Sequence, residues 1–164
     1  MAAPTTKQRF LDAVRQAWAE WAALLARVEP ARLDEPGVAG DWSVKDLVAH
    51  VAWYEREMVG LARGRALAGS PLWEVEQDRR NALLRDEQRD RAPDAVLAEA
   101  REIHRQALAA LDTLADDDLA DPRRFAGMPA DWAPWRVIAD NTYEHYRAHM
   151  PALRAWLDRA GGRS

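Results

Sequence analysis

The sequence of 164 residues contains no cysteine and only two lysines, against 21 arginines. Without cysteine the chain can form no disulfide, no thiolate metal site and no cysteine nucleophile of its own. No apolar run approaches the roughly 20 residues that a membrane-spanning helix needs. The start MAAPTTKQRF also lacks the hydrophobic stretch of a secretory signal. These absences predict a cytoplasmic protein without a membrane partner.

The composition and net charge of the chain indicate which kinds of molecule it binds. The chain is 48% hydrophobic and 30% charged, which is typical of a globular protein. Its formal net charge of −4 argues against a nucleic-acid-binding surface, because such a surface needs clustered positive charge on one face. The length fits one domain, residues 1–164, with a single substantial core.

Hydrophobic spacing along the chain is helical, and no segment shows the convincing alternation of a strand. Ser43 and Asp46 form an S-x-x-D start for one helix, and Pro93 suits the first turn of another. The predicted fold class is therefore all-α, a four-helix bundle. The apolar stripes place its helices at about 5–28, 43–63, 93–114 and 134–159. A long loop that contains Pro122, Gly127 and Pro129 is expected before the last helix.

The pattern weakens between the second and third predicted helices. Gly69-Ser70-Pro71 interrupts the chain, and the segment EVEQDRRNALLRDEQRDR then predicts an extra short helix whose charged residues face solvent. A second irregularity is expected in the last helix. Pro151 should bend or loosen one turn there, because proline cannot donate the backbone hydrogen bond.

Two of the four histidines, His145 and His149, lie four residues apart in the last predicted helix. Imidazoles at this spacing point the same way and can bind one ion. His50, on the flank of the second helix's apolar stripe, is the best third ligand. The alternative is an ordinary core of hydrogen-bonded histidines, and we expect that role for His104. The pair shares its stripe with Ile138, Thr142, Leu153 and Trp156.

Glu55, Glu57 and Glu144 are possible acid–base groups, with Glu57 the first choice, although carboxylates on such helices usually lie on the surface. Tyr54, also an acid–base candidate, lies one turn beyond His50, and Glu57 lies two turns beyond it on nearly the same face. Asn141, one turn before His145, could accept the second ring N–H of that histidine and so orient it.

Eight tryptophans are many for a chain of this length. Most are expected in the core, although some could form an aromatic pocket, and an exposed remainder could serve a homodimer interface. The candidates for the pocket are Trp18, Trp21, Trp53, Trp135 and Trp156.

Three segments carry a family resemblance: PTTK near the start, EPGVAGDWSVKDLVAHVAWYE at 35–55 and NTYEHYRAHMPALRAWL at 141–157. They closely resemble the DinB-like four-helix-bundle superfamily and, within it, the ClbS/DfsB-type branch. The branch is related to the N-terminal domains of mycothiol-dependent isomerases and transferases. The resemblance implies an often dimeric bundle and no DNA binding. It also implies a divalent metal bound by one histidine of the second helix and an H-x-x-x-H pair of the last, here His50, His145 and His149.

Three imidazoles around one ion, for which zinc or nickel is expected, leave positions open for water or substrate. Such a centre can activate water or a thiol, and in this cysteine-free chain the thiol must be external, for example mycothiol. The main hypothesis is a metal-dependent enzyme that acts on small electrophilic molecules by thiol transfer or hydrolysis, in detoxification or stress response. One alternative is a ClbS-like self-resistance protein that hydrolyses or sequesters a reactive natural product without metal. The other is a non-catalytic bundle with a structural metal.

Overall fold

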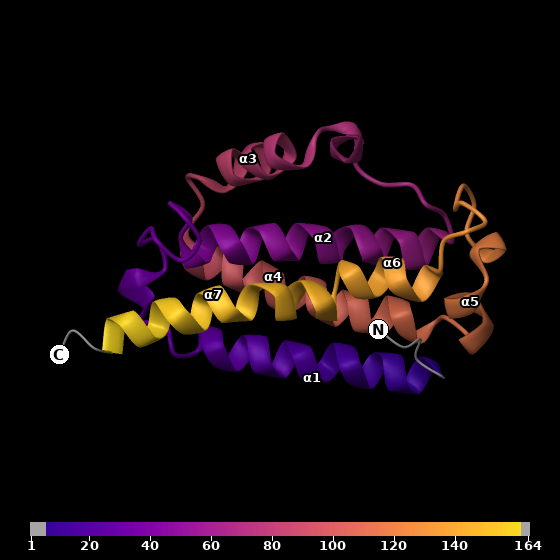
Figure 1. Ribbon diagram of the computed structural model, residues 1–164, viewed down its shortest axis with the longest axis horizontal. Helices are drawn as coiled ribbons and strands as arrows, with labels where there is room; N and C mark the ends of the chain where they lie inside the picture. Colours follow the sequence, from indigo (N-terminus) through magenta and orange to yellow (C-terminus); the bar gives the residue numbers. More distant parts are fainter. Residues whose placement is uncertain (1–5, 162–164) are drawn as a thin grey trace.

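Four long helices form the bundle in the computed structural model, which describes residues 6–161. They are α1 (Lys7–Leu25), α2 (Val44–Gly64), α4 (Pro93–Asp112) and α7 (Tyr143–Gly161), and they lie alongside one another (Figure 1). α2 packs mainly on α4, and α1 packs mainly on α7. The described part of the chain contains no β-strand, and none of its helices is long and apolar enough to cross a membrane. The predicted all-α bundle is confirmed.

Shorter helices complete the chain. α3 (Gln77–Gln88) lies between α2 and α4 in the sequence, so the predicted extra helix is also present. α5 (Asp116–Ala120) and the 3₁₀ turn Pro122–Arg124 occupy part of a segment that was expected to be a loop. α6 (Pro134–Asp140) then leads into α7 along nearly the same line (Figure 1).

Local interactions set both ends of α2. Asp46 N–H donates to Ser43 Oγ at 3.1 Å, and Ser43 N–H donates to Asp46 Oδ2 at 3.0 Å, which completes the predicted capping box. The helix ends at Arg65, whose φ of 48° is left-handed. This turn sends the chain back against Ala126, where the Leu67 N–H donates to the Ala126 carbonyl at 2.8 Å. The connection after α2 is thereby fixed beside the segment that leads to α6.

The core lies between the four long helices and follows the stripes that the sequence shows. Burying each large apolar side chain contributes roughly 1.5–3 kcal/mol relative to leaving it in water. The packing therefore supplies most of what holds the helices together. The largest fully buried side chains include Phe10, Trp21, Leu47, Leu111, Phe125, Ile138, Tyr146 and Leu153.

α3 lies outside the bundle, above α2 in Figure 1, and arginines hold it there. Arg80 is 8% exposed; its Nε donates to the Tyr54 hydroxyl at 3.0 Å and its Nη1 to the Val75 carbonyl at 3.1 Å. Arg85 Nε donates to Asp46 Oδ2 at 3.2 Å. The expectation that the charge run of this segment faces solvent is wrong for Arg80, whereas the Arg85 side chain stays 31% exposed. Because α3 buries few apolar side chains, guanidinium groups anchor it instead.

The last helix, predicted as continuous, is interrupted at Asn141 and Thr142. Thr142 Oγ1 donates to the Ile138 carbonyl at 2.7 Å, and Asn141 Nδ2 donates to the Val137 carbonyl at 2.8 Å. These side chains compete with the backbone for helical carbonyls, which breaks the regular helix. α7 then continues through Pro151. The break therefore lies ten residues before the proline that was expected to cause an irregularity.

Candidate metal centre and adjoining cavity

Three histidines from two helices converge in the middle of the bundle. α2 supplies His50, and α7 supplies His145 and His149 one turn apart. One nitrogen of each ring lies within 4.8 Å of one nitrogen of the others, and the Nε2 atoms of His50 and His145 are 3.0 Å apart. The i, i+4 spacing predicted that the pair would face the same way, and the structure places His50 opposite it.

Burial keeps these rings neutral. It lowers the pKa of His50 to about 3, with further contributions from His149 and Arg80. Burial and the two neighbouring histidines lower the pKa of His145 to about 2. The pKa of His149 is also lowered by burial. A neutral imidazole offers a nitrogen lone pair, so three such rings fit a divalent transition ion.

Apart from the 3.0 Å contact between the Nε2 atoms of His50 and His145, aromatic packing orients the rings. The Tyr54 ring lies 4.9 Å from the rings of both His50 and His145, measured between centroids, and Trp42 lies 5.4 Å from His50. The Nδ1 atoms of both histidines are buried without a hydrogen-bond partner among residues 6–161. The prediction that Asn141 accepts the second N–H of His145 is therefore wrong. The Asn141 amide instead donates to the Val137 carbonyl at the break before α7.

Tyr54 links the histidines to α3. Its hydroxyl donates to Asn81 Oδ1 at 3.0 Å and accepts the Arg80 Nε–H at 3.0 Å. The Arg80 guanidinium also lies over the Trp73 ring, 4.9 Å from its centroid. A permanent positive charge thus lies just behind the histidine cluster. The tyrosine predicted from sequence as an acid–base candidate is in contact with the proposed ligands.

Glu57 lies farther along α2 and does not contact the histidines. Its Oε2 accepts the Ser70 N–H at 2.8 Å and the Trp73 Nε1–H at 2.7 Å. The Trp73 ring in turn packs on Tyr54, with 5.4 Å between centroids. The structure therefore places the second acid–base candidate in the wall of a cavity, separated from the histidines by two aromatic rings.

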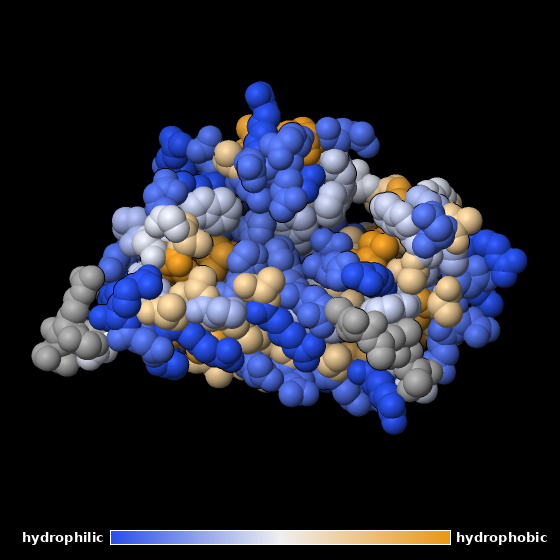
Figure 2. Space-filling model, viewed as in Figure 1, coloured by the Kyte–Doolittle hydropathy of each residue, from blue (hydrophilic) through white to orange (hydrophobic). Residues whose placement is uncertain are grey.

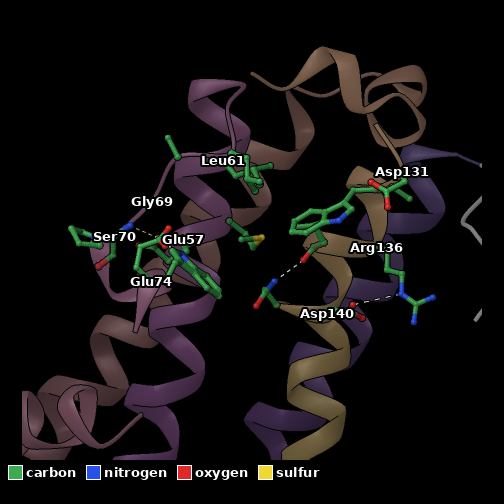
Figure 3. Close-up of a pocket in the computed structure, with 17 residues that line it drawn as sticks. Glu57, Leu61, Gly69, Ser70, Glu74, Asp131, Arg136 and Asp140 are labelled. Carbon is green, nitrogen blue, oxygen red and sulfur yellow. Dashed lines mark hydrogen bonds and ion pairs between the residues drawn. The ribbon is translucent and has the colours of Figure 1, made fainter. Parts of the chain in front are cut away.

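That cavity, of about 830 Å³, lies between α2, the connection from α2 to α3, and α6. Figure 2 shows the surface hollowed between the α3 side and the loop that precedes α6. In Figure 3, Glu57 and Ser70 lie on one wall, and Asp131 and Arg136 lie on the other. A volume of this size is typical of sites for small molecules.

The tryptophans that line the cavity are not those expected from the sequence. Trp73 and Trp132 line it, whereas Trp21 and Trp156 are buried in the core. Trp132 is 45% exposed, more than any other large hydrophobic side chain of the described chain. It lies in the irregular segment before α6, and an aromatic residue outside every helical stripe is the signal that could have indicated it.

His104 belongs to a separate buried network, as predicted. Its Nδ1 lies 3.0 Å from Glu55 Oε1 and 3.3 Å from the Tyr146 hydroxyl. Trp18 stacks on its ring, with centroids 4.1 Å apart. Burial, reinforced by Glu55, raises the pKa of Tyr146 well above its ordinary value. None of the residues of this network lines the cavity.

Solved structures of other proteins share this fold. The sibling lethal factor precursor DfsB superposes with a TM-score of 0.81 at 16% identity, covering 98% of this chain and 99% of its own. The colibactin self-resistance protein ClbS, in complex with a dsDNA, gives 0.77 at 18% identity, with 94% and 96% covered. The mycothiol-dependent maleylpyruvate isomerase gives 0.65 at 16% identity, and the match covers 90% of this chain and 60% of that one.

Comparison with curated proteins finds no significant match. Residues 14–149, however, match the family described as the mycothiol maleylpyruvate isomerase N-terminal domain. This range includes all three converging histidines and the whole lining of the cavity. The chain belongs to the mycothiol maleylpyruvate isomerase N-terminal domain family, with the DinB-like bundle that ClbS and DfsB also have.

Proposed function

We propose that the protein is a metal-dependent enzyme that joins a low-molecular-weight thiol, or water, to a small electrophilic molecule. The observation that carries this proposal is the convergence of His50, His145 and His149 as neutral imidazoles, with the Tyr54 and Trp73 rings between them and a cavity of about 830 Å³. These histidines would hold a zinc or nickel ion, and both ions accept nitrogen ligands. When bound, the ion supplies Lewis acidity that favours deprotonation of a thiol or water.

An external thiol fits this chain because the sequence has no cysteine to supply one. In the proposed transfer the thiol proton passes to solvent and the sulfur forms a bond to the electrophilic carbon. The leaving group departs with its electron pair, or in an addition the carbon acceptor takes a proton. Membership of a mycothiol-related family supports mycothiol as the thiol. The net charge of −4 supports a small molecule, rather than a nucleic acid, as the partner.

Tyr54 and Glu57 would take different parts in the reaction. The Tyr54 ring packs on two of the histidines, and its hydroxyl is held by Asn81 and Arg80. Glu57 uses Oε2 for the Ser70 and Trp73 N–H groups, and no described residue donates to its Oε1. We assign Glu57 to direct contact with the substrate in the cavity.

An activity assay on one preparation tests the proposal. Protein stripped with a chelator and reloaded with zinc or nickel is given mycothiol and a fluorogenic haloalkyl electrophile. We expect conjugation above the uncatalysed rate with metal, and its loss on stripping. Omitting the thiol while following loss of the electrophile separates hydrolysis from transfer. The His50→Ala variant, which removes one ligand, should behave like stripped protein.

The same assay distinguishes two other functions. Equal turnover of the electrophile by stripped and loaded protein would favour a metal-free resistance role of the ClbS kind, for which the shared fold is the support. A tightly held ion without any turnover would favour a structural metal. His145 and His149 are only partly buried, which favours a centre that a small molecule can reach.

A further inference from the structure

The walls of the cavity carry an excess of negative charge. The carboxylates of Glu57, Glu74, Asp131 and Asp140 line it, together with one guanidinium, that of Arg136. Arg136 Nε lies 3.7 Å from Asp140 Oδ2, so these two charges offset each other. Three carboxylates then have no cation of the lining beside them.

These three carboxylates are also free of other charged partners. Within residues 6–161, Glu74 and Asp131 form no side-chain hydrogen bond or ion pair, and both are exposed at the mouth. Glu57 receives two N–H groups on Oε2 and leaves Oε1 available. Arg80 does not line the cavity, but its guanidinium lies behind the wall, over the Trp73 ring at 4.9 Å from the centroid, and donates to the Tyr54 hydroxyl and the Val75 carbonyl.

The rest of the lining is apolar and aromatic. Met58, Leu61 and Val137 form part of the floor, and Trp73 and Trp132 add two indole rings. Figure 3 shows Leu61 at one end between the two walls, with Glu57 and Glu74 on one side and Asp131 on the other. Indole faces attract organic cations, and the attraction adds to that of nearby carboxylates. Because Arg80 already lies over the Trp73 ring, the exposed Trp132 ring is the one that we assign to the ligand. Apolar floor, indole rings and unpaired carboxylates together define one kind of ligand.

We propose that this cavity binds an apolar organic cation, a molecule with a hydrocarbon or aromatic body and one ammonium group. The ammonium lies beside Glu57 Oε1, and the body packs against Trp132 and the apolar floor. The same walls repel dianions such as maleylpyruvate, so the substrate differs in charge from that of the similar isomerase. This inference rests on the proposed function in one respect: the bound cation is taken to be the electrophilic substrate of the histidine centre.

The spacing between Glu57 and the histidines also sets a minimum length for the substrate. Glu57 follows His50 by seven residues of one helix, which is roughly 10 Å along the axis at about 1.5 Å per residue. A substrate that places its ammonium at Glu57 and its reactive carbon at the histidines must therefore be elongated.

Calorimetry with a matched pair of probes tests the charge preference. 4-Phenylbutylamine and 4-phenylbutyrate share the same body and differ in the sign of their charge. At low ionic strength we expect the amine to bind at least about tenfold more tightly, and the difference to shrink as added salt screens the carboxylates. Equal affinities, tighter binding of the carboxylate, or no binding of the amine would overturn the inference.

Two variants locate the binding. Glu57→Gln keeps an oxygen for the Ser70 and Trp73 N–H groups but removes the charge, and it should weaken amine binding about tenfold. Trp132→Ala, at an exposed position, should weaken it without affecting the fold. Glu20→Gln, on the exposed face of α1, is the control and should change nothing. Unchanged amine affinity in both cavity variants would overturn the assignment of the site.

Zinc binding by the same preparations separates this inference from the proposed function. Protein that binds zinc but does not prefer the amine would contradict only the charge class of the substrate. Protein that prefers the amine but takes up no zinc at the histidines would support the cavity assignment and contradict the metal-dependent reaction.

Discussion

Tyr54 orients the histidine cluster by the shape of its ring. Metal-binding histidines usually donate their second N–H to a carboxylate, a carbonyl or water, which fixes the ring. Here Nδ1 of His50 and of His145 lacks such a partner among the described residues, while the Tyr54 ring packs 4.9 Å from both imidazoles. Ring orientation decides whether the nitrogen lone pairs meet at one point. The site therefore depends on this aromatic contact.

A pair of substitutions separates the ring of Tyr54 from its hydroxyl. Tyr54→Ala should lower zinc affinity by about 10–100-fold, as loss of an orienting group does at other metal sites. Tyr54→Phe keeps the ring and should lower zinc affinity by less than about threefold. It should still reduce the free energy of unfolding by about 1–3 kcal/mol, because Arg80 Nε loses its acceptor.

Competition with a chromophoric chelator measures the zinc affinity of each variant, and urea unfolding of the metal-free proteins measures their stability. Equal losses of zinc affinity in the two variants would show that the hydroxyl, and not the ring, positions the histidines.

The existence of helix α3 can be predicted from the sequence, but its packing cannot. The sequence predicts its existence, because a charged segment with helical propensity follows a Gly-Ser-Pro break. It does not predict that Arg80 points inward, since hydrophobic periodicity treats every arginine as solvent-facing. The burial of Arg80 depends on the Tyr54 hydroxyl and on a turn carbonyl, which are supplied by other segments.

The break between α6 and α7 was missed for a related reason. The apolar stripe continues through Thr142 without a change of spacing, so the periodic pattern contains no sign of an interruption. Two side chains that bond to carbonyls of the preceding turn cause it. Pro151, which was expected to disturb the helix, lies inside α7.

Removing the Arg80 anchor should loosen α3 and leave the bundle intact. In Arg80→Ala, we expect hydrogen exchange to accelerate across α3 and the turn Pro71–Glu74, with little change in α1 and α4. Arg79→Ala, an exposed neighbour on the same helix, is the control and should leave exchange unchanged. Faster exchange throughout the chain would mean that Arg80 stabilises the whole fold and is not a local anchor.

Asp118 fixes α5 to the end of α2 and gives the fold a pH dependence. Its Oδ2 accepts the Ala115 N–H at 2.7 Å and lies 2.5 Å from Arg65 Nη1. Burial alone raises the pKa of this carboxyl. The Ala115 N–H and the guanidinium of Arg65 outweigh burial, so the pKa lies below its ordinary value of 3.8.

Because the unfolded carboxyl takes up a proton before the folded one, this stabilisation is complete above the ordinary pKa and decreases as the pH falls toward the folded pKa. Asp118→Asn should lower the free energy of unfolding by about 1–3 kcal/mol at neutral pH. The difference from wild type should shrink below about pH 4. Denaturant unfolding at several pH values measures it, and a difference that stays constant down to pH 3 would contradict this account.

At the scale of the whole molecule, the bundle and the histidines could be predicted, but the cavity could not. The histidine pair is a local feature of one helix, and the bundle brings α2 against it. The cavity is assembled from α2, the 67–74 connection and the 131–141 segment, whose approach depends on the left-handed turn at Arg65 and its pairing with Ala126. Its residues share no spacing in the sequence.

The homodimer stays a prediction from the family resemblance. The argument from tryptophan number does not support it, because Trp132 is the only exposed tryptophan of the eight, all of which are described. The other seven are buried or half-buried within one chain. An exposed aromatic in the mouth of a cavity is accounted for by the ligand proposed above.

Zinc uptake at the three histidines is the central claim, and elemental analysis after equilibrium dialysis tests it most directly. Wild-type protein should hold close to one zinc per chain. His149→Ala should lose most of that zinc while its circular dichroism and unfolding midpoint without metal stay near those of wild type, because His149 is only partly buried. His104→Gln, which changes a histidine outside the cluster, should still bind one. Wild-type protein that binds no zinc at these histidines in excess zinc would contradict the account.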